Sequence, residues 1–274
     1  SKVRVFRHEN GKNKGAGASR NLGIKKAQYD YIAFLDADDF YLPDHFRKPR
    51  EIFQDDNDEE IDGVYEAVGT HFEDEKAKEK WFSVRNWTLT TVKTPIQPEY
   101  LLEAILTKRV GWFHTDGITV RKSIFEKTGY FDEHLEIKQD SSMFLKMATI
   151  AYLLPGRITE AVSMRRVHSS NRWMVETEKD RYYNLLLWET LFRWSYRKWG
   201  SNKMVTNEKV EFFWSRYINN ILTKSMNENN LVQYRIKRFV ILFRMTQGFP
   251  KILKLSKYWK TLFIFLGWEK IKKL

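Results

Sequence analysis

The sequence has no cysteine among its 274 residues, and none of its apolar runs is long enough to cross a membrane. The absence of cysteine excludes disulfide scaffolds, cysteine zinc sites and thiol catalysis. The longest apolar candidate, Tyr258 to Trp268, is interrupted by Lys260 and falls far short of the roughly 20 residues of a transmembrane helix. Acids are also few relative to Lys and Arg, 35 against 47, and the net charge of +12 favours an anionic partner: nucleic acid, a phosphorylated ligand or a membrane surface.

The composition is that of a globular protein, with two halves of different character. Hydrophobic residues make up 42% of the chain, which is enough to form a core. Strand-like and helical segments alternate in the first part, which predicts a parallel or mixed α/β sheet. The later part has helical periodicity, many aromatic residues and many cations. We therefore expect an α/β domain over residues 1–174, followed by a basic, amphipathic helical region over residues 175–274.

Four segments of the first part have a clear pattern. Val3 to Arg7 is typical of a short strand, and Asp140 to Ile150 has helical spacing. Tyr31 to Leu35 is a continuous apolar run, which predicts a central parallel strand that is buried on both faces. The charged stretch from Glu73 to Lys80 is expected to be a connector.

Three aspartates, Asp36, Asp38 and Asp39, follow the apolar run directly. Ligands of open α/β sheets bind at the carboxyl ends of strands, and carboxylates crowded together there repel one another unless a cation joins them. A divalent cation with oxygen ligands, Mg²⁺ or Mn²⁺, is the natural partner. The alternative is a solvated turn in which Asp39 caps the next helix.

A glycine-rich stretch from Asn13 to Asn21 precedes this strand. Its glycines let backbone amides approach a ligand, while a helix N-terminus and the cations Lys14 and Arg20 favour an anion. A flexible connector is the alternative. Together with the acidic strand end, the stretch indicates a site for a metal-bound diphosphate.

The sequence contains three ordered motifs: NKGAGASRNLGIKKAQYDYIAFLDADD (Asn13 to Asp39), HTDGITVRKSIFEKTGYFDEHLEIKQDSSMFLKMA (His114 to Ala148) and RRVHSSNRW (Arg165 to Trp173). Together they resemble the signature of family 2 glycosyltransferases of bacterial type, which have the GT-A fold. The resemblance implies a Rossmann-like nucleotide-sugar transferase core. In the family, a strand, a helix and a second strand that form the nucleoside pocket come before such a segment. We therefore expect an N-terminally incomplete domain that binds nucleotide-sugar poorly on its own.

The resemblance also implies roles for residues on the donor side. The first acid of the DxD motif, Asp36, corresponds to a contact with the donor ribose or sugar, and Asp38 to a metal ligand. Asp39 and His168 are further candidates for the metal. Arg20, Lys14 and His168 are expected near the diphosphate.

On the acceptor side, the resemblance implies that Asp140 is the general base of an inverting transfer, because the family has an acid at this helix start. A simple helix cap is the alternative reading of Asp140. Four residues fall where the family lines its sugar and acceptor pocket: Trp112, His114, Asp116 and Gly117. Trp112 could equally be a core tryptophan.

The activity implied is a metal-dependent transfer of a sugar from a nucleotide-sugar to a glycan or lipid-linked acceptor in cell-surface polysaccharide synthesis. Residues 231–274 support a membrane setting, because eleven Lys and Arg residues stand there against the single acid Glu269, interleaved with aromatics. Such a region suits an anionic membrane surface, which would place the protein peripherally on the inner, cytoplasmic face of the cell membrane. A helix packed on the catalytic domain is the alternative.

Two other functions remain open from the sequence. One is a catalytically inactive, membrane-docking fragment. The other is a basic nucleic-acid-binding protein, although no nucleic acid is expected as a partner because no helix-turn-helix, zinc or RNA-sheet signature is present.

Overall fold

The computed structural model describes residues 3–55, 60–107, 110–168, 178–224, 240 and 242–265. The chain divides into two compact units, Ser1–Asp180 and Arg181–Leu274. The domain boundary predicted between residues 174 and 175 lies outside the described residues. In the part of the chain that the structure describes, no helix is both long enough and apolar enough to cross a bilayer.

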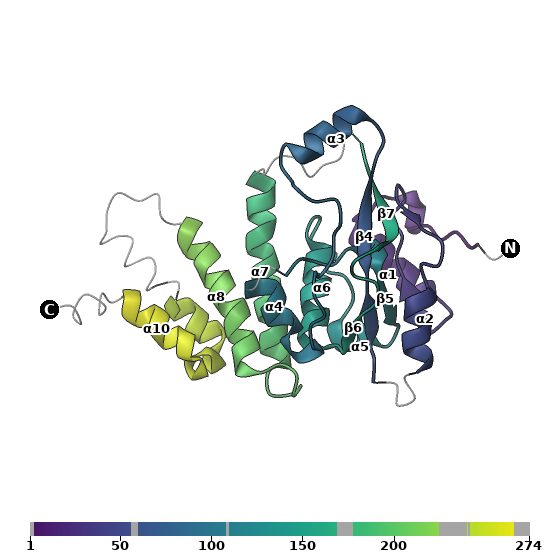
Figure 1. The fold of residues 1–274 in the computed structure, drawn as a ribbon. Coiled ribbons are helices and arrows are strands. Elements are labelled where there is room, and N and C mark those ends of the chain that lie inside the picture. Colours follow the sequence, from purple (N-terminus) through teal and green to yellow (C-terminus); the bar gives the residue numbers. More distant parts are fainter. Residues whose placement is uncertain are drawn as a thin grey trace. The chain divides into compact units, whose positions relative to one another are not determined.

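The first unit alternates short helices with short strands (Figure 1). Its strands are β1 (Tyr31–Ala33), β2 (Phe40–Tyr41), β3 (Gly63–Tyr65), β4 (Ala67–Phe72), β5 (Ile118–Arg121), β6 (Leu153–Pro155) and β7 (Ala161–Val167). Its α-helices are α1 (Gly15–Lys26), α2 (Arg47–Gln54), α3 (Glu75–Phe82), α4 (Leu101–Thr107), α5 (Ile124–Thr128) and α6 (Gln139–Ile150). Short 3₁₀ turns are η1 (Glu9–Gly11), η2 (Pro98–Tyr100) and η3 (Thr115–Gly117).

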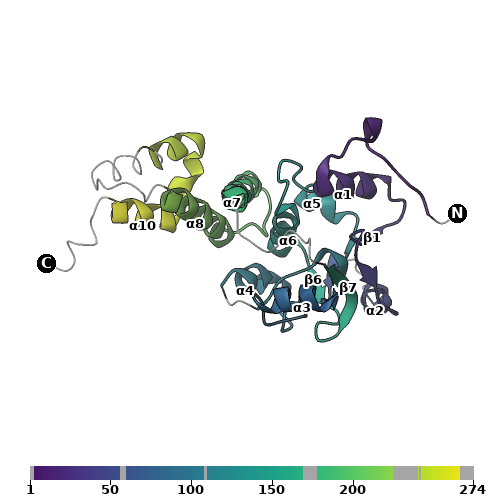
Figure 2. The ribbon, with the colours of Figure 1, turned by 90° about the horizontal axis from the view of Figure 1, so that it is seen from above.

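The strands form two mixed sheets, which confirms the predicted α/β class. In the four-stranded sheet the order is β1-β5-β3-β6, with β5 antiparallel to both β1 and β3, and β3 parallel to β6. In the three-stranded sheet the order is β2-β7-β4, with β2 antiparallel and β4 parallel to β7. Seen from above, α1 and α5 lie on one side of the strands, and α3 and α4 on the other (Figure 2).

The core of the first unit joins the four-stranded sheet to α6. Val64 of β3, Val120 of β5, Leu153 of β6 and Met143 of α6 are completely buried. Full burial of a side chain of this size contributes about 1.5–3 kcal/mol. These contacts hold the ends of the strands, where the candidate site lies, on a rigid frame.

The apolar run from Tyr31 to Leu35 differs from its prediction as a central parallel strand. β1 covers only the first three of these residues, lies at the edge of its sheet and is antiparallel to β5. Tyr31 is 43% exposed and Leu35 is 47% exposed. A run of apolar residues reports hydrophobicity but not the number of neighbouring strands. Here one face of Tyr31 packs on Phe53 of α2, with ring centres 4.5 Å apart.

Two other segments also correct their predictions. Residues Val3 to Arg7 form no strand, because no described strand pairs with them, and Val3 is 75% exposed. Val5 and Phe6 are exposed as well, at 74% and 43%. The expected connector from Glu73 to Lys80 is mostly helix α3, since Asp74 accepts a hydrogen bond from the Ala77 N–H at 2.7 Å and caps it.

The second unit is helical, as predicted. Helix α7 (Glu178–Lys198) leads into it, and α8 (Asn207–Lys224), the 3₁₀ turn η5 (Pro250–Lys254) and α10 (Ser256–Phe265) follow. Phe192 of α7 and Trp214 of α8 are buried, with ring centres 5.3 Å apart. Glu211 of α8 accepts a hydrogen bond from the Ser256 N–H at 2.6 Å and so ties α10 to α8.

Gly111 gives a direct test of how the segment before β5 is held. It has a φ of +114°, and an added Cβ would lie 1.9 Å from the Thr91 carbonyl oxygen. We expect Gly111→Ala to lower the free energy of unfolding by about 2–4 kcal/mol, through backbone strain and a steric clash. Gly23→Ala is the matched control, because nothing lies within 4 Å of its added Cβ inside α1, and it should be neutral or stabilising. Equal denaturation midpoints for the two variants would contradict this account.

Candidate functional site

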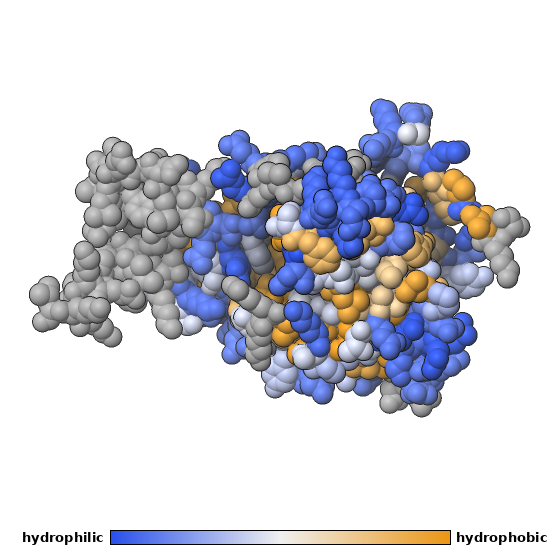
Figure 3. Space-filling view, turned by 45° about the horizontal axis from the view of Figure 1, so that its top comes forward, coloured by the Kyte–Doolittle hydropathy of each residue, from blue (hydrophilic) through white to orange (hydrophobic). Residues whose placement is uncertain are grey.

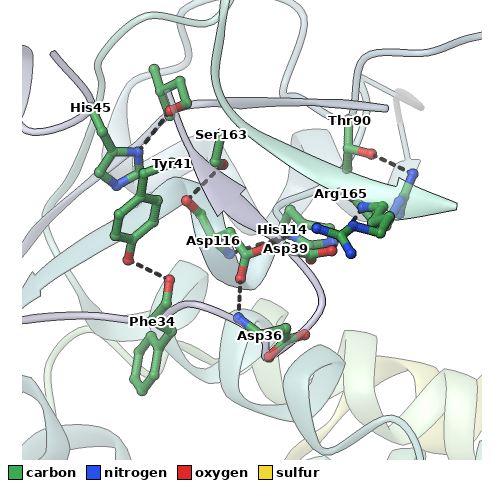
Figure 4. A network of polar contacts seen from close by, with 12 residues as sticks. Phe34, Asp36, Asp39, Tyr41, His45, Thr90, His114, Asp116, Ser163 and Arg165 are labelled. Carbon is green, nitrogen blue, oxygen red and sulfur yellow. Dashed lines mark hydrogen bonds and ion pairs between the residues drawn. The ribbon is translucent and has the colours of Figure 1, made fainter. Parts of the chain in front are cut away.

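Two loops meet where β1 ends and β5 begins. The antiparallel register pairs Ala33 with Thr119, so the residues that follow β1 lie against those that precede β5. The backbone N–H of Asp36 donates a hydrogen bond to Oδ1 of Asp116 at 3.1 Å (Figure 4). Asp116 therefore anchors the acidic loop, although 80 residues separate the two aspartates.

Three further hydrogen bonds fix the backbone on either side of this contact. The Tyr41 hydroxyl donates to the Phe34 carbonyl at 2.7 Å, and the Asp39 N–H donates to the Asp36 carbonyl at 3.1 Å. Ser163 of β7 donates its hydroxyl to the Asp116 carbonyl at 2.9 Å (Figure 4). The site is thus supported by both sheets.

Asp39, His114 and Asp116 form a compact cluster whose potential ligand atoms all lie within 4.8 Å of one another. The Asp116 side chain is completely buried, and its Oδ2 has no hydrogen-bond partner among the described residues. Nδ1 of His114 lies 3.6 Å from that oxygen. A buried carboxylate oxygen without a donor is costly, so its presence here points to a missing partner.

The protonation states of the cluster follow from its burial. Burial raises the pKa of Asp116 to about 9, and a hydrogen bond that the protonated carboxyl forms with Asp39, together with the charges of Asp36 and Asp39, contributes to this rise. Burial, reinforced by the charge of Arg165, lowers the pKa of His114 to about 3, so its imidazole is neutral at physiological pH. The Asp116 N–H donates to Nδ1 of this ring at 3.3 Å.

This donor set fits a divalent cation. It offers two carboxylates, one of them with a buried oxygen that lacks a partner, and one neutral imidazole. Carboxylate oxygens suit Mg²⁺ and Mn²⁺, and imidazole suits several transition metals. A bound cation would also offset the repulsion between the acids.

The residues predicted as metal ligands fall into two groups. Asp39 belongs to the cluster, together with His114 and Asp116, which the resemblance had assigned to the sugar pocket. Asp38 is instead half-exposed and pairs with His168, whose Nε2 lies 3.8 Å from an Asp38 carboxylate oxygen. The rest of the third motif, beyond His168, lies outside the described residues.

Arg20 joins the acidic loop to the start of α6. Its guanidinium forms an ion pair with Asp36 and donates a hydrogen bond to Oε1 of Gln139 at 3.1 Å. Asp140, the next residue, lies in the first turn of α6, where its Oδ1 accepts a hydrogen bond from the Ser141 N–H at 2.7 Å. The candidate general base is thus tied to the strand-end aspartates through its neighbour.

Sequence reasoning gave no role to Asn21, although it stands next to Arg20. Its side chain accepts a hydrogen bond from the Phe131 N–H and donates to the Phe131 carbonyl, each at 2.9 Å. It also donates to Glu133 at 2.9 Å. Asn21 therefore holds the turn that precedes α6, and only its place in the Arg-Asn pair of the motif could have signalled this.

Lys14 is exposed immediately before α1 and is not part of the cluster. Beside it, the Asn13 side chain accepts a hydrogen bond from the Gly15 N–H at 2.9 Å and shapes the glycine-rich loop. A cavity of about 550 Å³ opens next to this loop. Its lining includes two cations and consists of Phe6, Arg7, His8, Gly11, Lys12, Asn13, Ser19, Leu22 and Gly23.

Trp112 and Gly117 flank the cluster in sequence, and each has a structural role. The half-buried Trp112 donates its backbone N–H to the Thr91 carbonyl at 3.1 Å. A Cβ on Gly117 would lie 2.5 Å from the Glu66 carbonyl oxygen, so glycine is needed for the close approach of these two loops. The polar cluster depends on this approach because Asp116 directly precedes Gly117.

Comparison with known proteins identifies what part of the chain is similar to. Residues 1–129 match the model of the family described as glycosyl transferase family 2. Over these residues the chain is similar to this family. The match confirms the predicted family, and with the mixed α/β sheets it confirms the GT-A class of fold.

Relatives named as uncharacterised glycosyltransferases occur in several organisms. One from Rickettsia conorii is 29% identical over 61% of this chain and 25% of its own length. One from Haemophilus influenzae is 25% identical over 61% of this chain and 51% of its own length. The chain thus spans between a quarter and about half of the length of these relatives. A crystal structure of Staphylococcus aureus TarS residues 1–349 with UDP has a TM-score of 0.45 and 14% identity, covering 75% of this chain and 52% of that one.

Proposed function

We propose that this chain carries the catalytic site of an inverting, divalent-cation-dependent glycosyltransferase. It would move a sugar from a nucleotide-sugar donor to a glycan or lipid-linked acceptor in cell-surface polysaccharide synthesis. The family match supports sugar transfer, and the geometry of the site supports the finer assignment.

The observation that carries the proposal is the convergence of three distant segments on one polar site. Asp36 follows β1, Asp116 precedes β5, and Arg20 connects Asp36 to the first residue of α6. An acid that could serve as the base, Asp140, therefore begins a helix beside the acids that could hold the donor. Transfer with inversion needs a base on one side of the reacting carbon and a site for the leaving group on the opposite side.

On the donor side, Asp39, His114 and Asp116 would hold Mg²⁺ or Mn²⁺, which supplies charge neutralisation to the departing nucleoside diphosphate. Arg20 orients Asp36 for a contact with the donor ribose or sugar. The cavity beside the glycine-rich loop, with Arg7 and Lys12 in its lining, suits the anionic part of the donor.

On the acceptor side, Asp140 would take the proton of the attacking hydroxyl. Its position in the first turn of a 12-residue helix holds the carboxylate on a rigid element. The hydrogen bond from the Ser141 N–H occupies Oδ1 and leaves Oδ2 for the acceptor. Trp112, which is half-buried two residues before His114, would pack against an acceptor sugar.

We also propose that the second unit docks on the cytoplasmic face of an anionic membrane. Phe243, Leu253 and Trp259 are large exposed apolar side chains, and Lys251 and Lys254 are exposed beside them. The Trp259 indole N–H donates to the Leu253 carbonyl at 2.8 Å, so these two residues lie together. Of the eleven predicted tail cations, the side chains of Arg235, Lys237, Arg238, Lys260, Lys270, Lys272 and Lys273 lie outside the described residues.

The inactive-fragment alternative predicts that the chain does not turn over a nucleotide-sugar. The nucleic-acid alternative predicts salt-sensitive binding to DNA. Neither alternative explains why a buried carboxylate, a neutral imidazole and a second carboxylate share one site. We therefore rank the glycosyltransferase first.

The metal assignment can be tested without any donor. We expect calorimetric titration to show Mn²⁺ binding, and we expect Asp39→Asn and Asp116→Asn each to weaken it at least about tenfold. Loss of a residue that only supports a metal ligand already weakens binding by this factor, and loss of the ligand itself should cost at least as much. Asp38→Asn is the matched control, since Asp38 pairs with His168 outside the cluster and its loss should change affinity less. A larger loss of Mn²⁺ affinity in Asp38→Asn than in Asp39→Asn would show that Asp38 and His168 bind the metal instead.

The catalytic assignment is tested by turnover. With Mn²⁺ and a panel of nucleotide-sugars at high concentration, which the weak binding expected of an N-terminally incomplete domain requires, the chain should release nucleoside diphosphate. Asp140→Asn should lower kcat about 10²–10⁴-fold with donor affinity unchanged, because only the base is lost. Glu126→Gln, an exposed acid on α5, is the control. Turnover of Asp140→Asn at the control rate would remove the base assignment, and failure to bind any nucleotide-sugar would favour the inactive fragment.

The membrane assignment is tested by flotation with vesicles. Binding to phosphatidylglycerol-containing vesicles should exceed binding to phosphatidylcholine vesicles, and Lys251→Gln with Lys254→Gln should weaken it by about 2 kcal/mol, or roughly 30-fold. The double variant Arg197→Gln, Lys203→Gln removes two exposed cations elsewhere in the unit and is the control. Equal flotation with both lipids would exclude an anionic membrane as the partner.

A further inference from the structure

Two arginines surround one buried tryptophan next to the candidate site. The guanidinium carbon of Arg85 lies 4.6 Å from the ring centre of Trp81, and that of Arg165 lies 4.7 Å from it. Both lie 5.8 Å from the ring of Trp87, which packs edge-on against Trp81. The tryptophan pair thus gathers two positive charges in one place.

Burial is the main cost of this gathering. It lowers the pKa of Arg165 to about 10, an effect that the charge of Asp39 opposes and the charge of Arg85, a smaller contribution, reinforces. Nε of Arg165 is buried and has no hydrogen-bond partner in the described part of the chain. Two like charges with an unused donor form a ready site for an anion that bridges them.

Arg85 lies away from the glycine-rich loop of the donor side, whereas Arg165 borders the metal cluster. Arg165 lies beside Asp39 and His114, and its Nη2 donates to the Thr90 hydroxyl at 3.4 Å (Figure 4). Arg85 follows α3, which lies across the strands from α1, the helix that carries Arg20 and borders the glycine-rich loop (Figure 2). An anion at Arg85 is therefore distinct from a diphosphate at the loop of α1.

The surface around Arg85 also offers apolar area. Trp87 is 37% exposed, and Phe82 and Val84 are exposed near it. In Figure 3 the hydrophilic surface of α3 borders hydrophobic patches. The apolar face of a sugar ring packs well on an indole, while a few well-placed polar groups fix its orientation.

We propose that Arg85, Arg165 and the exposed part of Trp87 form an acceptor subsite for a saccharide that carries an anionic substituent, a phosphate or a carboxylate. The saccharide packs on Trp87, and its anion bridges the two guanidinium groups. The inference rests on the proposed glycosyltransferase function, because it takes the bound saccharide to be the acceptor.

The subsite is tested by binding to the full chain, measured by saturation-transfer NMR. The probes are methyl glucoside 6-phosphate, methyl glucuronide, neutral methyl glucoside and UDP. We expect at least one charged glucoside to bind about tenfold more tightly than the neutral one, because charge-assisted hydrogen bonds to arginine are strong. Comparing the first two probes identifies the anion as phosphate or carboxylate.

Variants then locate the binding. Arg85→Gln should abolish the preference for the charged glucoside, Arg85→Lys should restore part of it, and Trp87→Ala should weaken all three glucosides. Lys76→Gln, which removes an exposed cation from α3, is the control and should leave the preference unchanged. The main-chain contact at Trp87 survives its substitution, because the Trp81 indole N–H donates to the Trp87 carbonyl. Should Trp87→Ala nevertheless melt early, the comparison of Arg85→Gln with Lys76→Gln decides.

Three results would overturn the proposal: equal binding of charged and neutral glucosides, an Arg85→Gln variant that keeps the preference, or a loss of UDP affinity in Arg85→Gln that exceeds the loss of glucoside affinity. The last result would assign the arginines to the donor. Failure of the proposed function appears separately, as a wild-type chain that binds the charged glucoside through Arg85 but turns over no nucleotide-sugar.

Discussion

The contact of the Arg20 guanidinium with Asp36 and Gln139 is the constraint on which the site depends. It joins the first helix, the loop after the first strand and the start of α6. Arg20 is largely buried beneath the ring of Phe131, so its guanidinium group is held in one orientation. A planar guanidinium can satisfy two acceptors at once, which a lysine in this position could not do with the same geometry. Asn21 reinforces the arrangement by binding the turn before α6.

The cluster of Asp39, His114 and Asp116 beside this contact contains unfavourable electrostatic interactions. Asp116 is buried next to two other aspartates, and its second oxygen has no donor among the residues described. The surrounding fold supports this through Ser163, the Asp36 N–H and the close approach at Gly117. Groups placed against their electrostatic preference on a rigid frame are typical of functional sites, because the ligand supplies what the protein lacks. The arginines around Trp81 show the same feature with the opposite sign.

Sequence reasoning identifies candidate residues where the signal is local. The acids after an apolar run, the cations of the glycine-rich loop and the acid at the start of α6 are all recognisable from neighbouring residues. It failed where partners are distant. The exposure of β1 depends on which strands flank it, and Val3 to Arg7 form no strand because no described strand pairs with them. Helix α3 was missed because its charged residues obscured the capping aspartate and the buried Ala77 and Trp81.

The order of motifs by itself determined the family, the class of fold and the residue types available for chemistry, since these depend on which side chains occur and how they are spaced. Only the tertiary structure decided which acids share a site. Asp38 and Asp39 are adjacent in the chain, yet one pairs with His168 and the other joins His114 and Asp116. Successive side chains leave the backbone in different directions, so the antiparallel pairing of β1 with β5 selects which of them face each other.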